Sequence, residues 1–138
     1  MAAALTAQPP LAKLWTGSRG WEDAGTVCDA IEGFHKPFVS IVGDADGLDA
    51  IAWEALADFG LPRMQFKAKW KEGGQYRRWA GHERNDAMLY WLFYLRLRGW
   101  DCSVVAGWDG QSLGTKSMIE KAKGFGFPVW RLFYYRKG

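Results

Sequence analysis

The sequence FVSIVGDADGLD occupies residues 38–49 and contains three structural signals in succession. Its first part, Phe38 to Val42, is mostly apolar and β-branched, which is typical of a strand buried on both faces. Gly43 ends that strand, and a short acidic loop follows. Apolar residues then recur at helical spacing until Gly60 and Pro62; they are Ile51, Ala55, Leu56 and Phe59. This stretch therefore predicts a strand, a loop and a helix.

The same alternation continues in both directions along the chain. Further strands are predicted at 11–16, 64–68, 102–106 and 129–133, and further helices at 23–34, about 84–98 and about 114–125. Strands that alternate with helices predict parallel β-α-β units with helices on both faces of the sheet. We therefore expect an α/β fold: a single Rossmann-like, doubly wound domain over residues 11–138, with a mainly parallel five-stranded sheet. Residues 1–10 are expected to be a disordered lead.

The composition excludes several classes of protein. The 138 residues suit one domain, and 49% hydrophobic with 24% charged residues is typical of a globular chain. Cys28 and Cys102 are the only cysteines, so buried reduced thiols are expected rather than a disulfide framework or a metal site. The longest strongly apolar stretch, Ala87–Leu95, is about half as long as a membrane span. We expect a cytoplasmic protein with no metal, no cofactor and no membrane partner.

Three loops are expected to carry function, because doubly wound sheets bind ligands beyond the carboxyl ends of their strands, where the strand order reverses. These loops are 16–21, 43–49 and 107–115. Their glycines allow backbone N–H groups to approach an anion. A helix that begins at Gly114 or Thr115 adds unpaired N–H groups and a positive dipole end. The positive charge of Lys116, in the first turn of this helix, is unfavourable next to the positive dipole end unless an anion binds there. Together with Arg19, Lys116 favours a shared phosphate, although both are otherwise ordinary surface residues.

The acidic loop has several interpretations. Asp44, Asp46 and Asp49 do not have the spacing of an EF-hand, so a metal site is the least favoured one. The most favoured is that Asp46 caps the following helix and Asp49 stabilises its dipole. Alternatively, Asp44 or Asp49 accepts hydrogen bonds from ribose hydroxyls, as acidic residues do in Rossmann sites.

The segment 67–84 concentrates positive charge and aromatic rings. It contains six basic residues against Glu72 and Glu83, a balance of +4, with Trp70, Tyr76 and Trp79 between them. The basic residues are Lys67, Lys69, Lys71, Arg77, Arg78 and Arg84. Rings beside cations suit a nucleobase with its phosphates, and they also suit single-stranded nucleic acid. A third interpretation is a solvated loop whose rings pack into the domain.

These stretches, in this order, resemble the SLOG superfamily, a Rossmann-like group that includes the LOG hydrolases and the DprA/Smf proteins. The chain is most similar to the small one-domain YspA-like members. The resemblance covers nearly the whole chain. The matching pieces are Thr16–Arg19 with Trp21 and Asp23, residues 43–49, Trp70 with residues 80–88, Gly114–Thr115, and Pro128–Trp130.

The resemblance implies a site for a nucleotide or nucleotide derivative. Its residues, with those favoured by the loop arguments above, are Gly17, Ser18, Arg19, Trp21, Gly43, Asp44, Asp49, Arg84, Asn85, Gly114, Thr115 and Lys116. LOG hydrolases have a glutamate just after the Gly-Thr turn. Here Lys116, Ser117 and Met118 follow, so the carboxylate expected for cleaving an N-glycosidic bond is missing.

Three functions are therefore compared. The leading hypothesis is a sensor or sequestering protein for a nucleotide-derived ligand. The alternative is an enzyme that hydrolyses or transfers at a ribosyl bond, with Asp44, Asp49, Glu83 or Asp109 as acid and base. The second alternative is a domain that binds single-stranded nucleic acid through the basic aromatic segment.

The helix predicted at 84–98 also predicts self-association. Its run 88–95 is apolar or aromatic almost all round, whereas a helix on one face of a sheet needs a single apolar stripe. The surplus aromatics are among Tyr90, Trp91, Phe93 and Tyr94. We expect a homo-oligomer that pairs this helix across a two-fold axis, unless the basic segment folds back over it.

Overall fold

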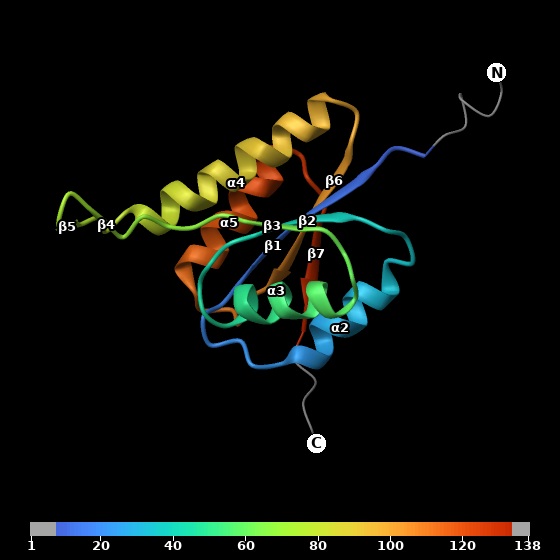
Figure 1. The fold of residues 1–138 in the computed structure, drawn as a ribbon, viewed down its shortest axis with the longest axis horizontal. Helices are drawn as coiled ribbons and strands as arrows, with labels where there is room; N and C mark the ends of the chain where they lie inside the picture. Colours follow the sequence, from blue (N-terminus) through green and yellow to red (C-terminus); the bar gives the residue numbers. More distant parts are fainter. Residues whose placement is uncertain (1–7, 134–138) are drawn as a thin grey trace.

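The computed structural model describes residues 8–133, and these contain a five-stranded parallel sheet (Figure 1). The strands are β1 (Leu11–Gly17), β2 (Val39–Val42), β3 (Arg63–Gln65), β6 (Asp101–Gly107) and β7 (Val129–Leu132). Their order is β3-β2-β1-β6-β7, and every neighbouring pair is parallel. The chain moves outward from β1 to β3 and then returns to the other side of β1. The strand order thus reverses between β1 and β6, and the predicted Rossmann-like fold is confirmed.

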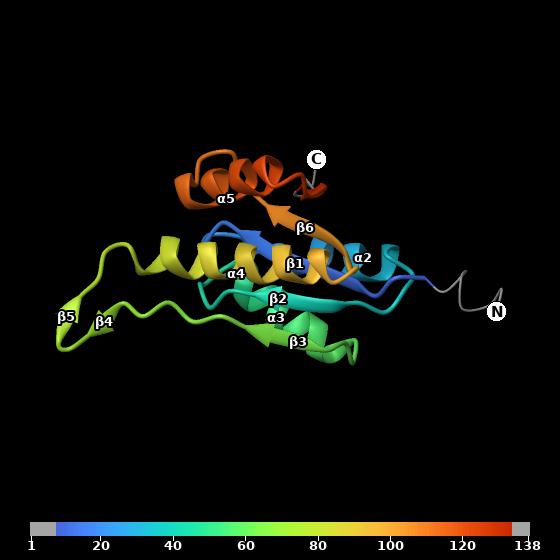
Figure 2. The same ribbon diagram turned by 90° about the horizontal axis from the view of Figure 1, so that it is seen from above.

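Two helices cover each face of the sheet (Figures 1 and 2). The first pair is α2 (Ala24–Gly33) and α3 (Leu48–Asp58), and the second is α4 (Ala80–Leu97) and α5 (Leu113–Gly124). Each pair buries its apolar face in a separate core. Alternate residues of β1 serve the two cores, since Trp15 faces α2 and α3 whereas Leu14 faces α4 and α5. The buried central strand fixes the position of the loops at its carboxyl end.

Close backbone contacts join those loops. Gly17 and Gly107 are register partners at the ends of β1 and β6. A Cβ atom on Gly17 would lie 2.1 Å from a methyl carbon of Leu48, so only glycine fits there. The N–H of Ser18 donates to the carbonyl of Gly107 at 2.9 Å, and the N–H of Leu48 donates to the carbonyl of Ser18 at 3.2 Å. The loops after β1, β2 and β6 therefore form one connected surface.

The structure corrects the predicted start of two helices. The helix predicted from about Arg84 begins at Ala80, with Trp79 at the capping position and no side-chain cap. The prediction that Asp46 caps α3 is wrong, because the capping position is Gly47, at a φ of 74°, and no side chain bonds to it. Glycine adopts a positive φ without strain, so the chain turns sharply into the helix at Gly47 without a cap from Asp46.

The basic segment forms an element that the sequence pattern did not predict. The predicted third strand ends at Gln65, and the chain continues into a small antiparallel hairpin of β4 (Lys71–Glu72) and β5 (Gln75–Tyr76). The hairpin projects beyond the N-terminal end of α4 (Figures 1 and 2). It does not fold back along that helix, so the aromatic side chains of α4 stay exposed.

The described residues also show the state of the cysteines, the grouping of metal-binding side chains and the character of the helices. Cys102 is buried and Cys28 is half-buried, and neither forms a disulfide. No group of histidine, cysteine, aspartate and glutamate side chains within residues 8–133 is arranged to hold a metal ion. None of the helices there has the length and apolar character needed to cross a membrane. Most of the expected lead and the last residues, 1–7 and 134–138, lie outside the described part of the chain.

Candidate functional site

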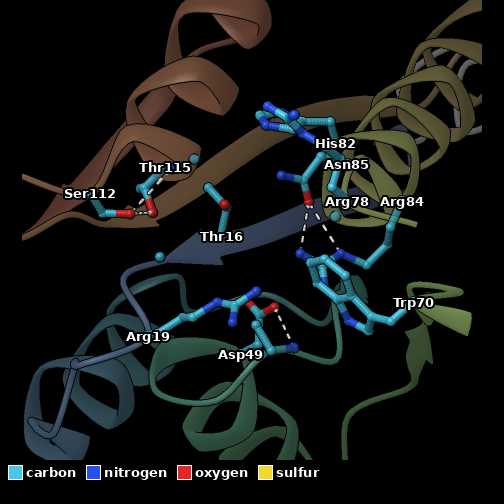
Figure 3. Close-up of a pocket in the computed structure, with 14 residues that line it drawn as sticks. Thr16, Arg19, Asp49, Trp70, Arg78, His82, Arg84, Asn85, Ser112 and Thr115 are labelled. Carbon is cyan, nitrogen blue, oxygen red and sulfur yellow. Dashed lines mark hydrogen bonds between the residues drawn. The ribbon is translucent and has the colours of Figure 1, made fainter. Parts of the chain in front are cut away.

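A cavity of about 150 Å³ opens at the carboxyl ends of β1 and β6, where the strand order reverses (Figure 3). The end of β1, the N-terminus of α5, the first turns of α3 and α4, and the segment that contains Trp70 and Arg78 contribute to its walls. Ligand sites of doubly wound sheets are expected at this place. We refer to this cavity as the cleft.

One wall of the cleft presents hydroxyl groups at a helix N-terminus. Ser112 is the capping residue of α5, and its Oγ accepts from the N–H of Thr115 at 3.5 Å and lies 3.2 Å from the Thr115 hydroxyl. Thr16 lies between this pair and the opposite wall in Figure 3. Because the first N–H groups of a helix lack internal partners and carry its positive dipole end, this wall suits an anion.

The other walls carry the guanidinium groups of two arginines. Arg19 and Arg78 line the cleft, and neither forms an ion pair with any residue between 8 and 133. Each lies against a ring instead. The Arg19 guanidinium is 5.5 Å from the centroid of Trp70, and that of Arg78 is 4.5 Å from the centroid of Trp79. Unpaired guanidinium groups favour an anionic ligand, in particular a phosphate, which they can bind through two parallel bonds.

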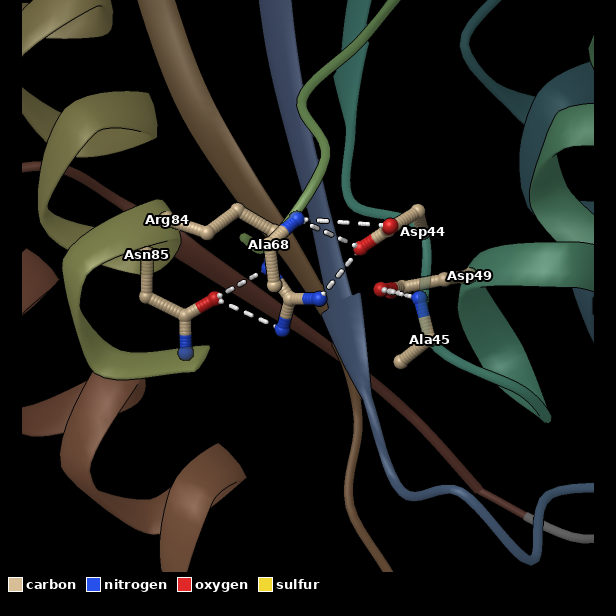
Figure 4. A network of polar contacts seen from close by, with 6 residues as sticks. All are labelled: Asp44, Ala45, Asp49, Ala68, Arg84 and Asn85. Atoms are coloured by element: carbon tan, nitrogen blue, oxygen red, sulfur yellow. Dashed lines mark hydrogen bonds and ion pairs between the residues drawn. The ribbon is translucent and has the colours of Figure 1, made fainter. Parts of the chain in front are cut away.

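Among the described residues that line the cleft, Asp49 is the one acidic side chain, and its relative exposure is 5%. Its Oδ2 accepts from the N–H of Ala45 at 3.1 Å (Figure 4). Burial raises the pKa of Asp49 to about 6, and the nearby charge of Arg84 opposes that rise only in part. A Cβ atom on Gly43 would lie 2.5 Å from Oδ2, so glycine is needed at that position to admit the carboxyl group. The other oxygen, Oδ1, makes no hydrogen bond to a described residue and is available to a ligand.

Arg84 is tied to the protein by all three of its nitrogen atoms (Figure 4). Nη1 donates to Oδ1 of Asp44 at 2.7 Å, and Nε and Nη2 each donate to Oδ1 of Asn85 at 3.2 Å. Asp44 also accepts from the N–H of Ala68, at 3.2 Å and 3.3 Å for its two oxygens. This network joins the loop after β2, the segment after β3 and helix α4. Arg84 therefore holds the cleft wall in place, and the amide nitrogen of Asn85 remains for a ligand.

The structure brings many of the residues expected at the site together, but not all of them. Those that line the cleft are Gly17, Arg19, Asp49, Arg84, Asn85, Gly114 and Thr115. The remaining ones support the walls or lie outside. Ser18 is buried and accepts from the N–H of Asp109 at 3.0 Å, and Trp21 packs in the core against Gly107. Gly43 and Asp44 act on Asp49 and Arg84 as described above. Lys116 is exposed on α5 and is not among the lining residues.

Other lining residues were not assigned to the site from the sequence; they are Thr16, Ala45, Trp70, Arg78, Gly81, His82 and Ser112. Ser112 had a detectable signal, since a serine directly before a helix is a common cap. Thr16 ends a strand next to the switch point, which is a second usable signal. Trp70, Arg78 and His82 reach the cleft only because the basic segment and the first turn of α4 pack together, and local sequence does not reveal that.

The structure also distinguishes among the acid and base candidates of the enzyme hypothesis. Glu83 is paired with Arg77 at 2.6 Å, and Asp44 is paired with Arg84. Asp109 accepts from the N–H groups of Gln111 and Ser112, each at 2.8 Å, and these bonds lower its pKa. Asp49 alone of these candidates lines the cleft.

Comparison with known proteins shows the fold. No protein-family model matches the chain, and no curated protein sequence matches it either. Among solved structures, DNA processing protein A from Streptococcus pneumoniae matches with a TM-score of 0.52 and 16% sequence identity. The chain has the same α/β fold as part of that protein. The match covers 88% of this chain and 58% of the streptococcal one, so the chain spans little more than half of that protein's length.

Proposed function

We propose that the chain binds a phosphorylated nucleoside derivative in the cleft and acts as a sensor or sequestering protein for it. The observation that carries this proposal is the combination of two unpaired arginines, Arg19 and Arg78, with the hydroxyl-lined N-terminus of α5. Such a wall attracts a phosphate, and the buried carboxyl of Asp49 beside it attracts a hydroxyl group. A phosphorylated ribose supplies both groups in one molecule.

The geometry supports one orientation of the ligand. A phosphate between Arg19 and the Gly114–Thr115 turn uses the helix N-terminus, and a ribose hydroxyl donates to Oδ1 of Asp49. Pockets that enclose drug-sized ligands usually measure about 300–1,000 Å³. Since this cleft measures about 150 Å³, we infer that the base extends past the sugar toward Trp70 and Arg78, which also line the cleft. The ligand is therefore held mainly by its phosphate and sugar.

The family relationship and the cellular compartment are two further proposals. Within the SLOG superfamily, we propose a relationship to the small one-domain YspA-like members, on the basis of the motifs that surround the cleft. A nucleotide-derived ligand and unpaired thiols suit the cytoplasm.

We also propose that the chain forms a homo-oligomer through α4. Tyr90, Trp91 and Tyr94 are 64%, 38% and 48% exposed on that helix, and Leu97 continues the patch at 68%. Phe93, by contrast, is half-buried against Phe125, with their ring centroids 5.5 Å apart. A monomer rarely leaves such a contiguous aromatic surface in water, and the same patch on a second copy is a natural complement.

Isothermal titration with nucleosides and their mono- and diphosphates tests the proposed ligand. We expect phosphorylated compounds to bind and nucleosides to bind much more weakly. Arg19→Ala should lower the affinity for phosphorylated compounds by roughly 10- to 150-fold, which corresponds to the loss of about 1.5–3 kcal/mol from a charge-assisted hydrogen bond. Arg98→Ala, which changes an exposed arginine at the far end of α4, is the matched control and should leave the affinity unchanged.

Two results contradict this proposal. Unchanged affinity of Arg19→Ala for every phosphorylated compound would place the anion elsewhere. Chromatography of the same samples after incubation tests the enzyme alternative, because release of free base at about 1 per second or faster would show that the cleft cleaves the glycosidic bond. In that case Asp49 becomes the first candidate for the acid or base.

A further inference from the structure

The segment 66–79, which we call the arm, is a second surface with a chemistry of its own. It consists of the extended stretch after β3, the β4–β5 hairpin and the residues that lead into α4 (Figure 2). The hairpin closes through Gly73 and Gly74, with φ values of 61° and 79°. Most of its residues are exposed, and it projects away from the sheet and its helices. An exposed, projecting element of this kind contributes little to the core, so its composition reflects another role.

The arm is strongly basic, and most of its cations are unpaired. It carries five basic residues and one acidic residue, a balance of +4, whereas the whole chain has +3. Arg77 is the exception, since it bonds to Glu72 at 3.1 Å and to Glu83 at 2.6 Å and thereby fixes the arm to the start of α4. The others form no ion pair with a residue of the described range; they are Lys67, Lys69, Lys71 and Arg78.

Two of the unpaired lysines share a groove on the arm. Lys67 and Lys69 line this groove of about 280 Å³ together with Arg77, Arg84 and the carboxylates of Glu72 and Glu83, which are both bonded to Arg77, whereas Trp70 lines the cleft. Lys71 is exposed in β4 and is not among the residues that line the groove. In an extended chain every second residue recurs at about 6.6 Å. That spacing is similar to the separation of successive phosphates along a stretched nucleic-acid strand.

Two aromatic rings on the arm are open to solvent. Tyr76 is 68% exposed and stacks on Trp70 with a centroid distance of 6.1 Å and an interplanar angle of 8°. Trp79 is 56% exposed and has Arg78 over its ring. Each ring has a neighbour in the protein, since Trp79 also lies beside the ring of His82 at a centroid distance of 5.6 Å. More than half of the surface of each residue is nevertheless open to solvent. An unpaired base can stack on a ring of this kind.

We propose that the arm binds single-stranded nucleic acid, with the phosphates along Lys67, Lys69 and Lys71 and unpaired bases on Tyr76 and Trp79. This inference goes beyond the binding of a small ligand in the cleft. A mononucleotide would use one lysine at most, and a duplex keeps its bases stacked inside, away from the rings. An acidic peptide would satisfy the lysines and leave the two rings without a role.

Fluorescence anisotropy with a labelled single strand of about 12 nucleotides tests the proposal, because sites of this kind cover roughly 4–16 nucleotides. Lys67→Gln/Lys69→Gln should lower the affinity roughly tenfold or more at about 0.1 M salt and reduce the slope of log K against log salt by about 1.4. The matched control, Lys36→Gln/Lys123→Gln, changes two exposed lysines away from the arm and should leave both values unchanged.

A second pair of variants separates stacking from charge. Tyr76→Ser should lower the affinity for the single strand roughly tenfold without changing the salt slope, because it removes a ring and no charge. Phe133→Ser, which changes an exposed ring at the end of β7, is the control.

The proposal is overturned if the single strand fails to bind at low salt, if a duplex of equal length or polyglutamate binds as tightly, or if Tyr76→Ser has no effect. The lysine pair should keep the nucleotide affinity of the cleft, so failure of the arm and failure of the cleft are distinguishable in the same protein.

Discussion

Asp49 is buried in the first turn of α3, where water cannot stabilise its negative charge. Its pKa is about 6, against an ordinary value of 3.8, and burial is the largest cause. The native protein therefore holds a proton at this carboxyl group in a pH range where the unfolded chain has already released it. A buried carboxyl group costs stability when it is ionised. Such groups are typical of functional sites.

This raised pKa predicts a pH dependence of stability. Since the native state binds the proton of Asp49 more tightly than the unfolded chain does, the free energy of unfolding falls as pH rises from about 4 to about 6. Above that range this carboxyl group causes no further change in stability. The pKa difference corresponds to about 3 kcal/mol. Asp49→Asn keeps an oxygen that can accept from the N–H of Ala45 and removes the charge. We expect the variant to gain up to about 3 kcal/mol relative to the parent between pH 4 and pH 7, measured by urea denaturation.

Asp44→Asn is a useful contrast, because it breaks an ion pair with Arg84 and should destabilise the protein at neutral pH. If the parent and Asp49→Asn showed parallel stability curves from pH 4 to pH 7, the carboxyl would be ionised in the native state throughout, contrary to the argument from burial.

Lys13 shows what the sequence cannot reveal at this scale. It lies in the middle of an apolar strand and is only 7% exposed. Its Nζ donates to Oγ of Ser103 at 3.0 Å and lies 3.8 Å from the centroid of Phe34. Desolvation lowers the pKa of Lys13, and Asp101 opposes that effect. Partners so distant along the chain come together only in the folded sheet, so no local pattern predicts a buried lysine.

At the scale of elements, the strands and helices of the sheet were predictable because their apolar periodicity and their glycine and proline boundaries are local properties. The beginning of α4 was not. Its first turn contains Gly81, which is unfavourable in a helix interior, and it has no side-chain cap. A Cβ atom on Gly81 would lie 3.2 Å from the ring of Trp70. The contact with a distant tryptophan thus accompanies the early start of the helix, whose first turn also contains the cleft residue His82.

The exposed face of α4 leads to a prediction about assembly. Trp91 and Tyr94 stack with centroids 5.4 Å apart and an interplanar angle of 25°, so they form one flat aromatic surface. Trp91→Glu places a charge on that surface, which a dimer would have to bury at a large cost. We expect sedimentation equilibrium at micromolar concentration to give a dimer or larger species for the parent and a folded monomer for Trp91→Glu.

The same substitution at Trp130, an exposed ring on the edge strand β7, provides the control and should leave the assembly intact. A parent mass near 15.6 kDa would show that the face of α4 stays in water. That result would leave the cleft and the arm unaffected, since neither depends on this face.

At the scale of the whole molecule, the cleft and the arm are adjacent and both are positive. Arg84 lines the cleft on one side and the lysine groove on the other. The general position of the cleft was predictable, because parallel strands place their carboxyl ends at one edge of the sheet. The part of its wall that contains Trp70 and Arg78 was not predictable, since it depends on how the arm packs on α4. Clustered charge on one side of a protein speeds the arrival of anionic ligands, and added salt reduces this effect.

The carboxylate of Asp44 has a thermodynamic consequence, because it bonds at once to Arg84 in the cleft wall and to Ala68 at the base of the arm. We predict that occupants of the two sites are linked through this carboxylate, and linkage requires each to change the affinity of the other by the same factor. Because the Asp44–Arg84 bond joins the cleft wall to the base of the arm, we expect a saturating nucleoside diphosphate to tighten oligonucleotide binding about fivefold or more, and the oligonucleotide to tighten nucleotide binding equally. Asp44→Asn should bring both factors toward one. Identical oligonucleotide affinities with and without the nucleotide in the parent protein would mean that this carboxylate transmits no free energy between the sites.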